Sequence, residues 1–227
     1  MLKYRNIILL FTLLLYTIVG SYLSVLNGIP HDQFHEQQNW VANYSAVKGL
    51  IYNNGDYEIL INYLDKYHGI AFHYFSQPIQ LVTHDFIGKL NQVSDITAYY
   101  ISRHLAVFLI FSISGIFFYL LSLKISNDKG FSIIATFIYL LFPYLFGHAQ
   151  INGKDIPFLS LWVICSYYLF LIIENFYFYK KNSLKLILSI SFFTAFLIGI
   201  RITGVLILLE YFIALIIFIN IRNISIF

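Results

Sequence analysis

The feature that most constrains this chain is a series of six apolar runs, each nearly free of charged residues. They cover residues 7–26, 104–123, 131–147, 158–178, 186–200 and 203–221. A helix of about 20 apolar residues crosses the ~30 Å hydrocarbon core of a bilayer, whereas irregular backbone would leave its polar groups unsatisfied there. Hydrophobic residues make up 59% of the 227 residues and charged residues 11%, more apolar surface than a soluble domain of this size can bury. The runs therefore predict an all-α fold, a polytopic membrane helical bundle of about six transmembrane helices.

Basic residues between the runs predict the orientation of this bundle. In a six-span arrangement they gather on one side, which by the positive-inside rule is the cytoplasm: Lys3, Arg5, Lys124, Lys129, Lys180, Lys181, Lys185 and Arg222. No small-residue cleavage site follows the first run, so we expect an uncleaved anchor with a cytoplasmic N-terminus. The abundant Ile, Phe, Tyr, Asn and Lys resemble the composition of AT-rich bacteria. The expected location is therefore the cell membrane, the inner membrane of a bacterium.

A long outer loop, residues 27–102, follows the first run within an expected single domain of residues 1–227. Residues 28–51 predict an amphipathic helix that lies at the membrane interface. Pro30 and Asp32 fall in its first turn, where a missing N–H costs nothing and the helix dipole favours a carboxylate.

Turn residues at 53–56 are expected to end this helix. A second short amphipathic helix is predicted over 57–67. The aromatic segment 67–85, centred on Pro78, is predicted to be re-entrant or interfacial. The first outer loop is thus expected to hold interfacial helices of its own.

One face of the helix predicted over 28–51 carries His31, Asp32, His35 and Glu36. The two histidines and the two carboxylates are each four residues apart, a spacing at which metal ligands project from one helix. The pattern differs from the helix-borne zinc signature H-E-x-x-H. A hard divalent ion at Asp32 or Glu36 that assists a phosphate is therefore favoured over permanent zinc. The alternative interpretation is a solvated polar face without chemistry.

A second group of charged residues lies in the short outer loop expected at 148–157. Lys154 and Asp155 are adjacent between two apolar runs, with Asn152 just before them. Arg201 divides the last two runs at a predicted outer turn. Charges at membrane depth are expensive and commonly mark a site or a partner. The alternatives are an ordinary wet loop tip and a snorkelling arginine.

Other polar residues near the runs have structural interpretations. Arg103 precedes the second run and is interpreted as an interface anchor, and Glu210 lies inside the last run without a partner evident in the sequence. The single cysteine, Cys165, excludes an internal disulfide. The absence of a Walker loop, a dinucleotide-binding glycine fingerprint and a G-x-S-x-G elbow disfavours soluble nucleotide chemistry. The net charge of +3 comes mostly from basic residues beside the apolar runs, so it bears on topology and no nucleic-acid partner is expected.

The outer loops and the run boundaries contain six short motifs. In order, they are Pro30-His-Asp-Gln-Phe-His35, Gly55-Asp56, His73-Tyr-Phe-Ser-Gln-Pro78, Ser102-Arg-His104, Asn152-Gly-Lys-Asp-Ile-Pro-Phe158 and Gly199-Ile-Arg-Ile-Thr-Gly204. Together they resemble the lipid-phosphate-sugar-dependent glycosyltransferases of the membrane-embedded C-type fold, a group that includes protein O-mannosyltransferases and aminoarabinose transferases. The chain departs from that family at Gln33, where a Glu often follows the first Asp. Members also have more spans and often an outer C-terminal domain, so the chain is expected to be the N-terminal part of a longer protein.

The resemblance implies transfer of a sugar from a polyprenyl-phosphate donor to a lipid, glycan or protein acceptor at the outer face of the membrane, with inversion at the anomeric carbon. Such chemistry needs a carboxylate to take the proton of the acceptor hydroxyl and positive charge on the departing phosphate. Asp32 is the expected base and Asp155 the second catalytic carboxylate. Lys154 and Arg201 are expected to bind the donor phosphate.

Four further residues are expected to support the acceptor or a metal: His31, His35, Glu36 and Asn152. A divalent metal ion at Asp32 and Glu36 is the one cofactor that the pattern admits, and nothing requires it. The expected partners are membrane lipids, an unidentified acceptor and the donor, whose lipid tail would lie in a groove between spans. The alternative is a non-enzymatic transport or assembly component with an outward histidine and acidic site. It is disfavoured because the charges gather at outer loops and not at mid-span, where transporter sites lie.

Overall fold

The computed structural model describes residues 2–52, 57–176 and 183–224, and every regular element in these ranges is a helix. The elements are α1 (Leu2–Ser24), α2 (Asp32–Tyr52), α3 (Glu58–Asn62), α4 (Ala71–Asn91), α5 (Asp95–Ser126), α6 (Lys129–Leu141), α7 (Pro143–Ala149), α8 (Asp155–Glu174), α9 (Leu184–Ile200), the 3₁₀ helix η2 (Ile202–Leu206) and α10 (Ile207–Ile224). The predicted all-α class is confirmed for this part of the chain.

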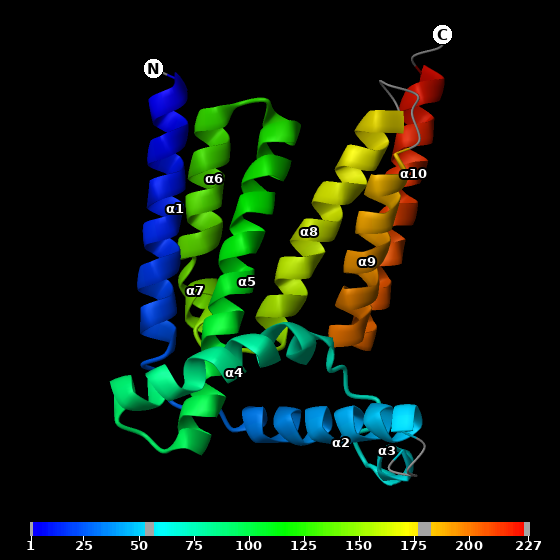
Figure 1. The fold of residues 1–227 in the computed structure, drawn as a ribbon. Coiled ribbons are helices and arrows are strands. Elements are labelled where there is room, and N and C mark those ends of the chain that lie inside the picture. The colour runs from blue at the N-terminus through cyan, green and yellow to red at the C-terminus, as the bar shows by residue number, and fades with distance from the viewer. Residues whose placement is uncertain (1, 53–56, 177–182, 225–227) are drawn as a thin grey trace.

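The helices form two layers that cross each other (Figure 1). Six apolar helices, α1, α5, α6, α8, α9 and α10, stand side by side as a bundle. Helices α2 and α4 lie across one end of it, and α1 begins and α10 ends at the opposite end. We call the end covered by α2 and α4 the capped end.

Two helices of the described ranges, α5 and α8, are long and apolar enough to cross a membrane, and α6 with α7 makes a third if the bent pair counts as one span. This is fewer than the six spans predicted. The run expected at 131–147 bends by 58° between α6 and α7, because Pro143 lacks the N–H of a continuing helix and its ring disfavours helical backbone at Phe142. Helix α9 has 17 residues and is about 25 Å long at ~1.5 Å per residue, short of a full span.

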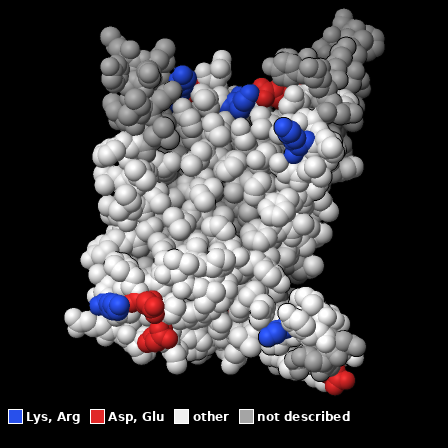
Figure 2. All heavy atoms as spheres, viewed as in Figure 1, with Lys and Arg blue, Asp and Glu red and all other residues white. Residues whose placement is uncertain are grey.

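The surface of the bundle is suited to a hydrocarbon environment. Figure 2 shows that the charged side chains on this face gather at the two ends, with an uncharged band between them. Large apolar side chains are exposed on the bundle helices, among them Phe11, Leu14, Ile134, Ile138, Phe192 and Leu209. Exposed apolar area on this scale is rare in soluble monomers. The apolar helices are therefore compatible with membrane insertion.

The core lies where α5 meets its neighbours. Ala106, Phe108 and Phe111 on α5 and Ile164 on α8 are almost completely buried. Helix α1 packs closely here because Gly20 lies against the ring of Phe108, leaving no room for a Cβ atom. Within the described ranges, α4 and α5 form the most extensive helix–helix contact. The capped end is thus joined to the core mainly through α5.

The loop predicted over 27–102 is helical for most of its described length. Helix α2 begins at Asp32, two residues after Pro30, close to the expected start. Helix α3 is shorter than the predicted 57–67, and the predicted turn at 53–56 lies outside the described residues. From Ala71 onward, the aromatic segment belongs to one continuous helix, α4, which contains Pro78.

The second predicted span begins earlier than its apolar run. Helix α5 starts at Asp95 and not at residue 104, so the connecting region before it is shorter than expected. The side chain of Ser94 accepts a hydrogen bond from the Thr97 N–H, which caps the helix start. Hydropathy alone places the boundary too late, because the first turns of α5 carry polar side chains, some exposed like Asp95 and some buried like Ser102.

Candidate functional site

A cleft at the capped end gathers most of the residues that the sequence singles out. Its volume is about 160 Å³, and we call it the charged cleft. Its lining consists of Pro30, Asp32, Gln33, Glu36, Arg103, His148, Ile151, Asn152, Gly153, Lys154, Asp155 and Arg201. Three acidic and three basic side chains from four parts of the sequence thus converge on one small space.

One wall of the charged cleft is a buried ion pair between α2 and α5. Arg103 Nη1 lies 3.2 Å from Glu36 Oε2, and Arg103 Nη2 donates a 2.6 Å hydrogen bond to Gln37 Oε1. The Arg103 side chain is 1% exposed and that of Glu36 15%. Gly153 closes over this pair, because a Cβ there would lie 3.2 Å from the same Glu36 oxygen. The interpretation of Arg103 as an interface anchor was wrong. Helix α5 begins before Arg103, at Asp95, and the Arg103 side chain is buried against α2.

Burial is the main influence on the pKa of Glu36. It raises the pKa of the Glu36 carboxyl above its usual range, and the nearby charges of Arg103 and Lys154 oppose this rise. Desolvation penalises a charged carboxylate, whereas a neighbouring cation favours it. The charge of Arg103 therefore favours the ionised form of Glu36, against the effect of burial on its pKa.

Asn152 shapes the loop that forms the opposite wall. Its side-chain oxygen accepts hydrogen bonds from the backbone N–H groups of Lys154 (3.0 Å) and Asp155 (2.8 Å). Its amide nitrogen donates to Asp155 Oδ2 at 3.0 Å and lies 3.1 Å from His148 Nδ1. Such a side chain satisfies the free N–H groups at a helix start. Asn152, which the sequence assigned to acceptor or metal support, holds the first residue of α8 in place.

The mouth of the charged cleft holds a second, exposed ion pair. Arg201 Nη2 lies 2.6 Å from Asp155 Oδ1, and their side chains are 40% and 53% exposed. Arg201 ends α9 in an extended conformation before η2 begins. The turn is tight because Gly204 packs against the backbone of Ile198, where a Cβ would lie 3.0 Å away. The predicted outer turn at Arg201 thus brings this arginine to the start of α8.

Two charged side chains of the cleft remain without a direct partner. Within the described residues, the carboxylate of Asp32 and the Nζ of Lys154 make no hydrogen bond or ion pair, although both line the cleft. Partial burial lowers the pKa of Lys154, and Arg201 adds to this, while the charges of Glu36, Asp155 and Asp32 raise it. Asp32 and Lys154 are therefore the carboxylate and the ammonium available to a ligand.

His31 and His35 do not line the charged cleft. Both are exposed, and their rings contact each other edge to face with centroids 5.9 Å apart. Across the described ranges, no group of three metal-ligating side chains includes them, Asp32 or Glu36. The geometry gives no support to the metal site that the sequence admitted there.

Gln33 lines the charged cleft and His73 lies near Arg103, and no role was predicted for either residue. Gln33, the departure from the family pattern, is buried; its amide donates to the Tyr100 carbonyl and its oxygen lies 3.1 Å from His104 Nε2. His73 stacks on Trp40 with centroids 5.5 Å apart. Their signal in the sequence is their place in the short motifs, Gln33 directly after Asp32 and His73 at the start of His73-Tyr-Phe-Ser-Gln-Pro78.

His73 is held neutral by its surroundings. Burial lowers its pKa to about 3, and the charge of Arg103 adds to this, while the carbonyl groups of Ile70 and Glu36 oppose it. Neither ring nitrogen makes a well-formed hydrogen bond. A protonated His73 would place an additional charge beside Arg103, which the packing disfavours.

Glu210, which had no partner evident in the sequence, is bound by α8. Trp162 Nε1 donates to Glu210 Oε2 at 2.6 Å, and Ser166 Oγ donates to Oε1 at 2.7 Å. These contacts tie α10 to α8 away from the charged cleft. They support a structural part for Glu210.

A larger cavity of about 390 Å³ lies between α1, α5 and α6 and shares no residue with the charged cleft. Its lining is almost entirely apolar, with Leu13, Tyr16, Ile116, Leu120 and Phe137 among its members. Such a groove suits a hydrocarbon chain, whereas the polar chemistry lies in the charged cleft.

Comparison with known proteins identifies no family: no protein-family model, no curated protein and no solved structure matches the chain. What the charged cleft can do must be inferred from its own geometry. It offers a free carboxylate, a free ammonium and two further ion pairs within one small space. This set can accept a proton and bind an anionic group at the same time.

Proposed function

We propose that the chain transfers a sugar from a polyprenyl-phosphate donor to an acceptor hydroxyl at the outer face of the membrane. The observation that carries this proposal is the convergence of unpaired Asp32 and unpaired Lys154 on one cleft. A base and a cation in one site are what sugar transfer from a lipid phosphate needs. The resemblance of the short motifs to lipid-phosphate-sugar-dependent glycosyltransferases supports the same reaction.

In the proposed reaction, the acceptor oxygen attacks the anomeric carbon while the bond from that carbon to the phosphate oxygen breaks. Asp32 takes the proton of the acceptor hydroxyl, and the polyprenyl phosphate leaves with the bonding electrons. Lys154 stabilises the negative charge that builds on the phosphate, because an ammonium is worth most where charge develops. Attack from the face opposite the phosphate inverts the anomeric carbon.

The exposed pair completes the proposed site. Asp155 holds Arg201 over the mouth of the charged cleft, and this arginine can exchange its carboxylate for a phosphate oxygen, since guanidinium groups match both. The donor's lipid tail would lie against the apolar helices of the bundle, in contact with membrane lipids. The acceptor is a hydroxyl-bearing lipid, glycan or protein.

This reaction requires the capped end to face outward, so we propose that the apolar bundle lies in the membrane with the N-terminus in the cytoplasm. The positions of the basic residues support this orientation. Gln38 on α2 is exposed, and a cysteine placed there should react with a membrane-impermeant thiol reagent added to intact cells. Labelling that requires permeabilised membranes would reverse the orientation and remove the outer site.

The function is tested by following release of labelled sugar from a polyprenyl-phosphate donor in vesicles that contain the full chain. Asp32→Asn keeps the shape of the side chain but removes the base, so turnover should fall by roughly 10²- to 10⁴-fold while donor affinity changes little. The matched control is Asp65→Asn, which alters an exposed carboxylate between α3 and α4 that does not line the cleft. Equal turnover in the two variants would remove Asp32 as the base.

A further inference from the structure

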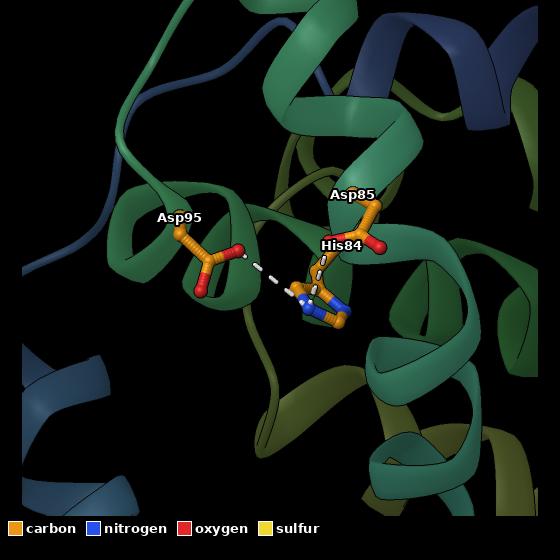
Figure 3. Close-up of side chains that lie close together, drawn as sticks. All are labelled: His84, Asp85 and Asp95. Carbon is orange, nitrogen blue, oxygen red and sulfur yellow. Dashed lines mark ion pairs between the residues drawn. The ribbon is translucent and has the colours of Figure 1, made fainter.

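A second cluster of polar side chains lies where α4 turns into α5, outside the charged cleft (Figure 3). His84 Nε2 lies 3.2 Å from Asp85 Oδ1 and 3.6 Å from Asp95 Oδ1. One ligand atom from each of the three residues falls within 4.8 Å of the other two. We call these residues the corner cluster.

The hydrogen-bond partners of Nδ1 indicate where the ring hydrogen of neutral His84 lies. Its Nδ1 lies 3.1 Å from the backbone carbonyl oxygens of both Gln80 and Leu81. Carbonyl oxygens only accept, so the ring hydrogen belongs on Nδ1. In the neutral ring, Nε2 then directs a lone pair at two carboxylates. Three electron-rich atoms then converge, and either a proton on Nε2 or a metal ion between the three atoms makes the contact favourable.

We propose that the corner cluster binds a divalent cation of the zinc type, with His84 Nε2 and one oxygen each from Asp85 and Asp95 as ligands. Two ligands at ~2.0–2.1 Å from a tetrahedral zinc are about 3.3–3.4 Å apart. The observed separations of 3.2 and 3.6 Å bracket this value. Histidine nitrogens and carboxylate oxygens both ligate zinc, and zinc sites with three protein ligands hold a water in the fourth position.

The surroundings of His84 are those of a metal ligand. A ligating histidine almost always donates its second ring N–H to a carbonyl or carboxylate, which fixes the ring and raises its basicity. The carbonyls of Gln80 and Leu81 provide this contact within α4 itself. The carboxylates are 78% and 77% exposed, so an ion can enter from solvent without rearrangement of the core.

A cation here would connect two helices at a corner. His84 and Asp85 belong to α4, whereas Asp95 lies in the first turn of α5. The bound cation would hold the first turn of α5, the helix that carries Arg103, against α4. The corner cluster shares no residue with the charged cleft. Its presence does not depend on the proposed sugar transfer, and the two proposals can fail separately.

The probe is Co²⁺, and then Zn²⁺, added to the purified full chain in detergent after chelator treatment, with a purification tag that contains no histidine. We expect one ion per chain, with the visible absorption of Co²⁺ in a low-symmetry site. His84→Gln and Asp95→Asn should each weaken binding by at least ~10- to 100-fold, the loss that even outer-shell changes cause. His84→Cys supplies another zinc ligand and should retain Zn²⁺ binding.

The matched control is the pair Asp65→Asn and His68→Gln, which removes exposed residues of the same types at the capped end. It should bind Co²⁺ and Zn²⁺ as the unaltered chain does. Helix content measured by circular dichroism shows that each variant is folded. The absence of stoichiometric binding in the unaltered chain would overturn the proposal and leave a proton as the cation between His84 and the carboxylates. Binding that survives His84→Gln and Asp95→Asn would overturn it equally.

Discussion

The two ion pairs of the charged cleft differ sharply in their surroundings. Arg103 and Glu36 are 1% and 15% exposed, whereas Arg201 and Asp155 are 40% and 53% exposed. Breaking a buried pair leaves a charge without solvent and is strongly destabilising, whereas an exposed pair contributes little. The comparison separates a fixed wall, which holds α2 on α5, from an adjustable mouth between α8 and α9.

The two side chains without a direct partner line the same cleft as these two ion pairs. Asp32 is one helical turn before Glu36, and Lys154 directly precedes Asp155. Each is thus close in sequence to a carboxylate that already has a cationic partner, Glu36 with Arg103 and Asp155 with Arg201. A binding site needs side chains held in place by rigid neighbours, here the buried pair, and access from solvent, here past the exposed pair.

The largest expected effect follows from breaking the fixed wall. Arg103→Gln should lower the free energy of unfolding by about 3–5 kcal/mol, because Glu36 is left buried without its cation. Thermal unfolding of the purified protein in detergent measures this loss. Adding Glu36→Gln to the same chain should recover part of it, since the stranded carboxylate is removed. A loss below about 1 kcal/mol would show that the buried pair contributes no more to stability than an exposed pair does.

Acid should loosen the same wall through His73. The pKa of His73 is lowered to about 3 by burial, from an ordinary value of about 6.5. Between these values the unfolded chain binds a proton that the folded chain does not, so the free energy of unfolding falls as the pH falls. The expected loss relative to neutral pH is about 2 kcal/mol at pH 5.

His73→Phe keeps an aromatic ring against Trp40 but cannot bind a proton. Stability of this variant, measured at pH 7 and pH 5, should lack that part of the acid loss. The exposed His31→Gln serves as the control and should keep it. Identical acid losses in the unaltered chain and in His73→Phe would contradict the assignment.

The smallest effect on stability is expected at the mouth. Asp155→Asn should cost less than about 1 kcal/mol, because the pair is exposed and water replaces its contacts. If the proposed function holds, sugar release should nevertheless fall, since Arg201 loses the carboxylate that positions it. Glu174→Gln breaks a partly exposed ion pair with Lys124 at the other end of the bundle. Glu174→Gln should leave turnover unchanged. An equal fall in turnover in Glu174→Gln and Asp155→Asn would show that the pair of Asp155 and Arg201 has no specific part in the reaction.

The sequence predicts the helices better than their lengths. Apolar runs indicate each bundle helix, because a run of apolar residues is a local property. The start of α5 at Asp95 and the break at Pro143 depend on neighbours and on one residue's backbone chemistry. Periodicity therefore finds the elements, and packing decides where they begin and end.

The candidate site divides in the same way. Asp32, Lys154, Asp155 and Arg201 stand out in the sequence because charges are rare there, and the structure brings them into one cleft. Arg103 could not be assigned to this cleft, since its burial depends on α2 lying across α5. His84 and Asp95 were missed as a pair because they meet only at the corner between two helices. The sequence shows which charged residues lie near apolar runs, but not which of them form ion pairs with one another.

The central claim is that the charged cleft binds the donor phosphate through Lys154, its one cation without a direct partner among the described residues. The most direct test is the affinity of the purified full chain for a polyprenyl phosphate, compared between Lys154→Ala and Lys48→Ala, an exposed lysine on α2 outside the cleft. A charge-assisted hydrogen bond of about 1.5–3 kcal/mol predicts roughly 10- to 100-fold weaker binding for Lys154→Ala alone. Unchanged affinity in Lys154→Ala, or an equal loss in both variants, would contradict it.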